Sequence, residues 1–430
     1  MNHQTFPDNP DLPLADNILS VPKSATLAIN ELSKQLIHEG QDVIRLGLGQ
    51  SPFPVPDMMV CALKAYAATK DYMQVQGYLP LREAISQFIK KTEGLERPAN
   101  NVIIGPGSKE LLFGLQMALD CDLVLPAPSW VSYDPQARLL GRNIHWLPCY
   151  ADDGWKLTAE TLDRHCNDHP DRRQLLIINS PNNPSGACFT EDELKALADI
   201  ASRHKVIVLS DEIYSELHYS GGHQSLARYY PQGTIISNGI SKWAGAGGWR
   251  LGFFSFPDEL MPVLQSMIVI ASETFTSVSA PVQMAAISAF EGSDELFNYI
   301  HAARKIMREI SATISQQFQQ VKIDVIDPQG GFYNLPDFSQ YRELLNRNSI
   351  TTSNQLCREM LKNTGVAGLP GSDFGLGDGL LMRFAFVDFD GAKLIDKLLE
   401  DPSLPINQET RELKHLFQAV PRIHDWINSL

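Results

Sequence analysis

The chain has 430 residues, of which 43% are hydrophobic, and a formal net charge of −14. This length exceeds one ordinary domain, so we expect two. The negative charge argues against a nucleic-acid backbone or an anionic membrane as the main partner, and no apolar run is long enough to cross a bilayer. A local anion site stays possible, because backbone amides and a few arginines can build one inside an acidic protein.

The start of the chain and the cysteines bear on the compartment. The first residues, MNHQTFPDNPDLPLADN, lack the basic and apolar regions of a secretory signal. The six cysteines are scattered without a CxxC pair, which is typical of free thiols in a reducing compartment. We therefore expect a cytoplasmic protein.

One pair of histidines has the spacing of metal ligands. His165 and His169 are four positions apart and flank Cys166, but Pro170 follows at once and the sequence shows no third ligand nearby. We interpret the pair as part of a polar surface turn and expect no metal.

The N-terminal part of the chain predicts a helix near Thr26–His38 and a short strand at Val43–Leu46. The strand leads into GLGQSPFPVP, where Gly49 allows the backbone to come close to a ligand. Apolar residues then recur at helical spacing from Leu81 onward, which puts Tyr72 in the loop before that helix.

The middle of the chain alternates short apolar runs with helical patterns. A helix follows Thr190, which forms a capping box with Glu193. The apolar runs read as strands buried on both faces, as in a parallel sheet: Val102–Ile104, Leu123–Leu125, Leu175–Ile178, Val206–Leu209, Thr234–Ile236 and Leu251–Phe254. This alternation predicts an α/β domain with its ligand site at the carboxyl ends of the strands.

The C-terminal part mixes helices and strands, as in an α+β domain. A long helix at Asp294–Gln320 precedes strands expected at Ile323–Ile326, Gly331–Leu335 and Leu380–Phe386. We expect a large domain over residues 55–300 and a small one formed by residues 1–54 and 301–430.

The segment GISKWAGAGGWRLG, residues 239–252, surrounds Lys242 with small residues and places Arg250 eight positions later. Small neighbours let a flat ring lie close to the backbone, and lysine forms Schiff bases with carbonyl ligands, pyridoxal phosphate (PLP) above all. Arg250 could bind the phosphate of such a cofactor. The alternative is a Gly-rich loop with a solvated lysine.

Two further segments suit the same cofactor. GPGSKELLFGLQMAL begins a helix after a strand, so the amides of Ser108 and Lys109 can point at a phosphate; the alternative is an ordinary N-cap by Ser108. Trp130, just after another strand, is placed to stack on the pyridine ring, although a tryptophan there could equally anchor the core.

A PLP enzyme also needs a carboxylate that keeps the pyridine nitrogen protonated. Asp211, in LSDEIY at a strand end, suits this role, and a carboxylate at that depth is costly unless it is paired. Tyr214 and Asn183 could bond the phenolate oxygen of the ring. SPNNPSG, which contains Asn183, taken alone indicates only a turn.

Arg383 is the candidate for binding the substrate α-carboxylate. It interrupts the apolar strand LLMRFAF, where an unpaired guanidinium would be expensive, and its geometry suits a carboxylate. A structural ion pair is the alternative.

Motifs along nearly the whole chain resemble those of class I/II aminotransferases, in particular aspartate aminotransferases. In family order and at family-like spacing the chain has NPSG, SDEIY, SKWAGAGGWRLG, GGFYNLP, VAGLPGSDFG and MRFAF. The resemblance implies PLP fold type I, with a mostly parallel central sheet in the large domain, and gives Asn183, Asp211, Tyr214, Lys242, Arg250 and Arg383 the roles above. YMQVQGYLPLREAI resembles the segment whose tyrosine, here Tyr72, reaches the cofactor phosphate in the partner subunit, which implies a homodimer.

The resemblance also implies a reaction. An L-amino acid would give its amino group to a 2-oxo acid in ping-pong order, with Lys242 moving the Cα proton and with Arg383, Gly49, Asn183 and Lys109 at the substrate. A dicarboxylic or aromatic substrate is expected, because some bacterial aspartate and prephenate aminotransferases resemble this chain at Lys109. The alternatives are a PLP-dependent β-lyase or ring-closing synthase, a ligand-sensing regulator, which the short N-terminus disfavours, and a dehydrogenase, which the missing GxGxxG disfavours.

Two positions depart from the family pattern. Gly239 stands where many relatives have a phosphate-binding serine, so that contact is missing or comes from Ser237 or Ser241. GQSPF stands where relatives often have GEPDF, close to where substrate enters, which weakens any carry-over of substrate identity.

Overall fold

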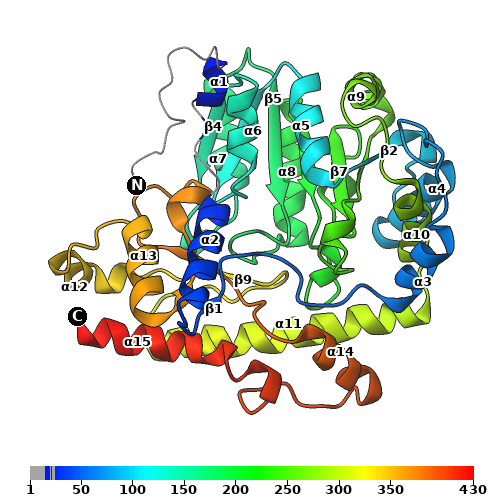
Figure 1. Cartoon of the computed structure of the whole chain (residues 1–430). Helices are drawn as coiled ribbons and strands as arrows, with labels where there is room; N and C mark the ends of the chain where they lie inside the picture. Colours follow the sequence, from blue (N-terminus) through cyan, green and yellow to red (C-terminus); the bar gives the residue numbers. More distant parts are fainter. Residues whose placement is uncertain (1–14, 20, 22–24) are drawn as a thin grey trace.

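The computed structural model describes residues 15–19, 21 and 25–430. The expectations drawn from the first fourteen residues therefore lie outside the described residues. A seven-stranded sheet forms the centre of the molecule, in the order β2-β8-β7-β6-β5-β3-β4 (Figure 1). Its strands are β2 Val102–Gly105, β3 Asp122–Ala127, β4 Ile144–Pro148, β5 Gln174–Asn179, β6 Ile207–Asp211, β7 Thr234–Gly239 and β8 Gly252–Ser255.

The sheet is mostly parallel. The neighbouring pairs from β7 across to β4 are parallel, whereas β8 is antiparallel to both β7 and β2. The predicted α/β class with a mostly parallel central sheet is confirmed, and all six predicted strands of this region are present. The interpretation of Leu251–Phe254 as a parallel strand is wrong.

Fifteen α-helices accompany the strands in the described part of the chain. They are α1 Asp16–Leu19, α2 Ala25–His38, α3 Asp57–Tyr66, α4 Leu79–Glu93, α5 Ser108–Ala118, α6 Tyr133–Leu139, α7 Ala159–Asp168, α8 Glu191–Arg203, α9 Met261–Glu273, α10 Ala280–Glu291, α11 Asp294–Gln320, α12 Arg342–Arg347, α13 Ser353–Thr364, α14 Gly391–Glu400 and α15 Ala419–Ser429. The predicted capping box of Thr190 and Glu193 begins α8.

Apart from the edge strand β4, both faces of the central sheet are buried, which explains why its strands are mostly apolar. Along β3, Leu123 and Leu125 pack in one cluster with residues of α5 and α9, while Val124 points to the other face and packs with residues of α7 and α8. No helix among the described residues combines the length and apolarity needed to cross a membrane.

The last third of the chain returns to the N-terminal segment. The helix α11 runs along one side of the molecule past the end of the central sheet, and α15 lies near it (Figure 1). Two small sheets complete this region: β1 Ile44–Arg45 pairs in parallel with β10 Val366–Ala367, and β11 Leu369–Pro370, β12 Met382–Ala385 and β9 Tyr333–Asn334 form an antiparallel sheet. Residues before 54 thus pair with residues after 301, while the exact domain boundaries stay a prediction.

One local prediction is wrong, and one strand was not predicted. Residues 323–326 form no strand and contribute only an isolated bridge between Asp324 and Asp337. The edge strand β4 was not predicted, because IHWLP interrupts its apolar residues with a histidine and ends in proline.

Candidate active site

The predicted site residues gather where the parallel strands end. Asp211 is the last residue of β6, Asn183 follows β5, Trp130 follows β3 and Lys242 follows β7. Because these strands are parallel neighbours, their carboxyl ends share one edge of the sheet. Arg383 reaches this edge from β12, since its Nη1 donates to Asn183 Oδ1 at 3.3 Å.

Lys242 is half-buried, and its amine turns inward. Its Nζ donates to the carbonyl oxygen of Gly49 at 2.6 Å and lies 5.6 Å from the ring centre of Tyr214 and 5.7 Å from that of Phe332. Burial, and next the charge of Arg383, lower the pKa of this amine to about 8. The alternative of a solvated lysine is therefore wrong, and the amine loses its proton at a lower pH than an ordinary lysine does.

Asp211 is 3% exposed and carries no cationic partner in the described part of the chain. Its carboxylate accepts hydrogen bonds from Tyr133 Oη at 2.6 Å and from Ser237 Oγ at 3.4 Å. Burial raises the pKa of Asp211 to about 6, although both hydrogen bonds oppose the rise. A positively charged N–H group placed against this carboxylate would offset the cost of burying it.

Tyr214 is held by a residue that sequence reasoning did not assign. The hydroxyls of Tyr214 and Tyr333 are 2.7 Å apart, and burial raises the pKa of Tyr214. Tyr333 also sets the requirement at position 49, since a Cβ on Gly49 would lie 2.1 Å from the Tyr333 hydroxyl oxygen. Gly49 is thus a position of close approach to Tyr333, and its approach to a ligand stays a prediction.

Arg383 is 3% exposed and forms no ion pair with any residue the structure describes. Its Nη2 donates to the Gly47 carbonyl oxygen, its Nε has no hydrogen-bond partner in the described part of the chain, and the guanidinium lies 4.7 Å from the ring centre of Tyr333. The alternative of a structural ion pair is wrong. A buried guanidinium with a free N–H suits an incoming carboxylate.

A cluster of cations and amides lies beside the N-terminus of α5. Gly107 is the N-cap and Ser108 the first helical residue, so the alternative of Ser108 as an ordinary N-cap is wrong. Arg250 donates to the carbonyl oxygens of Gly247 at 3.1 Å and Pro106 at 3.2 Å, which leaves its charge unneutralised. Together with the helix N-terminus these groups suit a phosphate.

Lys109 and Trp130 are in contact next to this cluster. Lys109 Nζ lies 5.0 Å from the ring centre of Trp130, and burial, with the charge of Arg250, lowers the pKa of Lys109. Trp130 is half-buried and meets Tyr133 edge to face at 5.3 Å. The indole thus packs against the core cluster that contains Tyr133 without being fully buried, and its stacking on a cofactor ring stays a prediction.

Tyr72 stands apart from these residues. It lies in the loop before α4, as predicted, and is 92% exposed. Within one chain it contributes nothing to the site.

The departure at Gly239 has a local steric cause. A Cβ at this position would lie 2.8 Å from the Leu251 carbonyl oxygen, so a serine would require the chain to shift. Ser237, one of the two predicted replacements, is fully buried and donates to Asp211. It is therefore engaged beside the carboxylate.

The residues present fit PLP in three respects. Asp211 has no cationic partner among the described residues, and a protonated pyridine nitrogen would provide one. Arg250 at the N-terminus of α5 donates only to carbonyl oxygens, and the Lys242 amine is near enough to feel the charges of Asp211, Arg250 and Arg383. Sequence reasoning missed Tyr133 and Tyr333. Tyr133 follows Trp130 in the segment APSWVSY and Tyr333 stands in GGFYNLP, but nothing in the sequence tells which neighbour their hydroxyls meet.

The interpretation of His165 and His169 as a polar surface turn is wrong. His165 is 8% exposed within α7, and His169 is the C-cap of this helix. A third histidine, His145 of β4, packs against both rings although it lies twenty residues earlier in the sequence.

Comparisons with known proteins agree with this geometry. A family model described as "Aminotransferase class I and II" matches residues 41–390. An aspartate aminotransferase from Geobacillus stearothermophilus is 33% identical over 381 residues, covering 86% of this chain and 94% of that protein. A probable aspartate/prephenate aminotransferase from Thermus aquaticus is 30% identical, covering 90% of this chain and 97% of its own. The structure of aspartate aminotransferase from Thermus thermophilus with maleate superimposes with a TM-score of 0.81 at 28% identity, over 90% of this chain and 98% of that one. The chain therefore belongs to the class I and II aminotransferases.

Proposed function

We propose that this protein is a PLP-dependent aminotransferase that moves the amino group of an L-amino acid to a 2-oxo acid in ping-pong order. The observation that carries the proposal is that the Lys242 amine turns inward close enough to Arg383 to feel its charge. The buried guanidinium of Arg383 has no ion-pair partner in the described part of the chain. One residue suits the chemistry at Cα and the other holds the carboxylate attached to the same carbon.

The cofactor would be held by residues from several elements. Asp211 would bind the pyridine nitrogen, Tyr214 and Asn183 the phenolate oxygen, and Lys242 the aldehyde carbon. Ser108, Lys109 and Arg250 of the cluster at α5 would bind the phosphate, and Tyr72 would reach it from the partner subunit. Trp130 would lie against the ring. When bound, PLP supplies an electron sink for the electron pair that the substrate Cα keeps after losing its proton.

The chain's own groups then have defined tasks. Arg383 binds the substrate α-carboxylate through two parallel hydrogen bonds, and Asn183 orients the guanidinium from the side. Lys242 Nζ, with its pKa lowered to about 8, takes the proton from the substrate Cα and delivers it to the aldehyde carbon of the cofactor. Asp211, with a pKa of about 6, is ionised at neutral pH and keeps a proton on the nitrogen that faces it.

We further propose a dicarboxylic amino acid as the preferred donor, with an aromatic one next. The support is Lys109, a cation beside Trp130 and the phosphate cluster, which could bind a distal carboxylate. The names of the relatives, aspartate and aspartate/prephenate aminotransferases, point the same way. Cytoplasmic localisation and a homodimer belong to the same proposal.

The test combines a spectrum with an assay. We expect near-visible absorbance from the purified protein, its loss in Lys242→Ala, and formation of a 2-oxo acid from aspartate that requires a second oxo acid. Release of thiol, ammonia and a 2-oxo acid from an amino acid with sulfur at Cβ, without any added oxo acid, would mean that the protein is a β-lyase. A colourless protein that does not respond to added PLP would contradict the use of this cofactor.

A further inference from the structure

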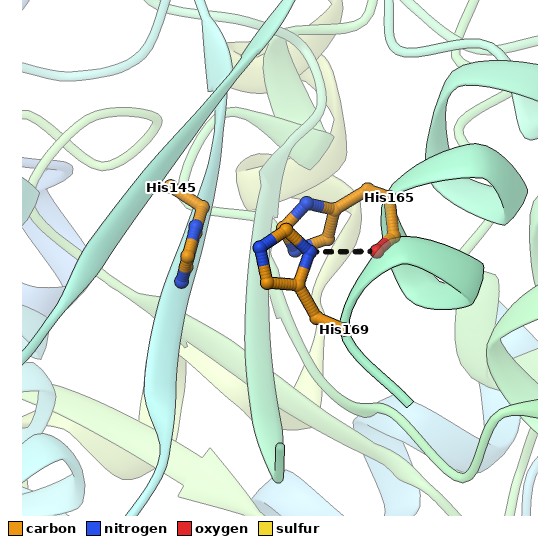
Figure 2. Close-up of side chains that lie close together, drawn as sticks. All are labelled: His145, His165 and His169. Atoms are coloured by element: carbon orange, nitrogen blue, oxygen red, sulfur yellow. Dashed lines mark hydrogen bonds between the residues drawn. The ribbon is translucent and has the colours of Figure 1, made fainter. Parts of the chain in front are cut away.

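Three histidines from two elements meet on the edge of the central sheet. His145 lies on β4, His165 in α7 and His169 just after α7, with ring centres 4.5 to 4.9 Å apart (Figure 2). One nitrogen of each ring lies within 4.8 Å of one nitrogen of each of the others. Imidazole nitrogens are the ligands that zinc and similar divalent ions prefer.

Two of the rings have a nitrogen available. His169 Nδ1 donates to the His165 carbonyl oxygen at 3.0 Å, the hydrogen bond drawn in Figure 2, which leaves a lone pair on its Nε2. His165 is 8% exposed, and its Nε2 has no hydrogen-bond partner in the part of the chain that the structure describes. A buried nitrogen without a partner calls for an explanation, and a bound ion would provide it.

The third ring is oriented by a carboxylate. His145 Nε2 lies 3.3 Å from Asp122 Oδ2, and Asp122 is held in turn by Arg172 Nε at 2.8 Å and Asn143 Nδ2 at 3.0 Å. Donation from Nε2 to this carboxylate leaves the lone pair on Nδ1. Carboxylate–histidine pairs of this kind fix the ring and tautomer of many metal ligands.

The other group with metal-like spacing, Glu93, Glu212 and His223, differs from this one. Arg228 Nε lies 2.8 Å from Glu93, and Glu212 accepts from Ser225 and lies 3.3 Å from His223. Its negative charge is thus already compensated by protein groups. In the cluster of three histidines, by contrast, no described protein group serves as a partner for the free nitrogen of His165.

We propose that His145, His165 and His169 bind a divalent transition-metal ion, most suitably zinc, which ties the edge strand β4 to the C-terminal end of α7. Bonds of 2.0–2.1 Å would place the three nitrogens about 3.3 Å apart, so the rings must close by roughly 1.5 Å. His145 and His169 are only half-buried, so small shifts of these rings are not blocked on their exposed sides. Their exposure also leaves a fourth coordination position for water.

This site is separate from the candidate active site. His145 pairs in register with Val124, near the start of β3, whereas the Lys242 site lies at the carboxyl ends of the strands. The proposed ion would therefore stabilise the sheet edge without touching the substrate, and the inference does not depend on the reaction that the enzyme catalyses.

The test is a titration of the untagged holoenzyme with zinc chloride in competition with a chromophoric chelator. We expect one zinc per chain in the wild type, at least about tenfold weaker binding in His145→Asn and in His169→Asn, and no change in His301→Asn, which alters an exposed histidine of α11. Amino-transfer activity should be the same in all four proteins. Wild-type zinc binding in both His145→Asn and His169→Asn would overturn the proposal.

Hydrogen exchange then locates the ion. Neither measurement requires the replacement of His165, which would disturb the packing of α7. Zinc should slow the exchange of backbone amides in α7 and β4 of the wild type but not of His145→Asn, and magnesium should have no effect. Protection centred on the residues around Lys242 instead would mean that zinc binds in the active site, and the proposal would fail.

Discussion

At the scale of single residues, the site depends on charges that are buried without an opposite charge beside them. Arg383 has only neutral partners, and Asp211 accepts hydrogen bonds only from uncharged groups, the hydroxyls of Tyr133 and Ser237 and the backbone amide of Ile213. Such groups reduce the stability of the free protein, and a bound charged ligand repays that cost. Each of the two therefore predicts a distinct effect of substitution.

Replacing Arg383 by lysine keeps the charge but removes the paired N–H donors. We expect KM for the amino donor to rise roughly 10- to 100-fold, as the loss of a charged hydrogen bond of about 1.5–3 kcal/mol implies, while the cofactor absorbance is unchanged. Steady-state kinetics and a PLP titration measure the two effects. Arg308→Lys, at an exposed position on α11, is the control and should match the wild type. Equal losses of donor and PLP affinity would show that Arg383 is structural.

Asp211 predicts a pH effect on the apoenzyme. Its pKa is about 6 in the folded protein and ordinarily 3.8, so the folded state holds the proton more tightly and stability falls as pH rises through this range, by about 3 kcal/mol once the pH exceeds 6. Asp211→Asn removes the charge and keeps an acceptor for Tyr133. We expect the PLP-free variant to exceed the wild type in free energy of unfolding by about 1–3 kcal/mol at pH 8, and by less at pH 5.

Urea denaturation of both apoenzymes at the two pH values measures this difference. The same variant should lose most of its amino-transfer activity, because the neutral amide cannot keep the ring nitrogen protonated. An apoenzyme destabilised by Asp211→Asn at pH 8 would contradict the account of an uncompensated carboxylate.

The sequence predicted the residues whose chemistry is unusual for their surroundings, and it missed those that act through ordinary contacts. Lys242 among glycines and Arg383 within an apolar strand are conspicuous, because such placements are costly. Tyr133 and Tyr333 are not, because a tyrosine near a strand end is common, and its hydroxyl partner depends on segments up to 119 residues away. The histidine cluster was missed for the same reason, since its third member comes from another element.

At the scale of elements, the turn before α5 positions the phosphate cluster. Gly107 has a φ of 87°, and a Cβ there would lie 2.4 Å from Arg250 Nη2. Gly107→Ala should therefore displace the guanidinium and weaken PLP binding at least about tenfold, in addition to a backbone cost of roughly 1–2 kcal/mol in stability.

The matched control is Gly94→Ala at the end of α4. Gly94 has a φ of 69° and no atom within 4 Å of an added Cβ, so its replacement incurs the backbone cost alone. Gly107→Ala should lose more stability than the control, because a φ of 87° with a ψ of 156° lies in a region that essentially only glycine adopts, but it alone should lose PLP affinity in titrations of the two apoenzymes. Equal PLP affinity of the two variants would show that Arg250 does not bind the phosphate.

The strands show how far local pattern determines an element. The apolar runs of the central sheet are predictable, because burial on both faces demands them. The direction of β8 is not, because an antiparallel strand buried on both faces has the same composition as a parallel one. Residues 323–326 are apolar except for Asp324 and form no strand, since Ile323 is buried against the core and only Asp324 has a bridge partner.

At the scale of the whole molecule, the remaining question is what covers the segment around Tyr72. This tyrosine is 92% exposed, and Tyr66 and Leu79 on either side are 39% and 41% exposed. Exposed apolar side chains in one segment are typical of an interface. A second copy of the chain would bury them and bring Tyr72 to the cluster of Ser108 and Arg250, so each site would combine residues from two chains.

This arrangement can be tested by mixing two defective chains, Lys242→Ala and Tyr72→Ala. The first lacks the amine, and the second should bind PLP weakly, so neither homodimer is active at limiting PLP. In a hybrid dimer, one site would receive Lys242 from one chain and Tyr72 from the other and would be intact. Random reassociation of equal amounts should therefore restore roughly a quarter of the wild-type activity, with the rest of the sites inactive. If each site were complete within one chain, mixing would restore nothing, because every site would keep its own defect; a monomeric mass in solution would contradict the dimer directly.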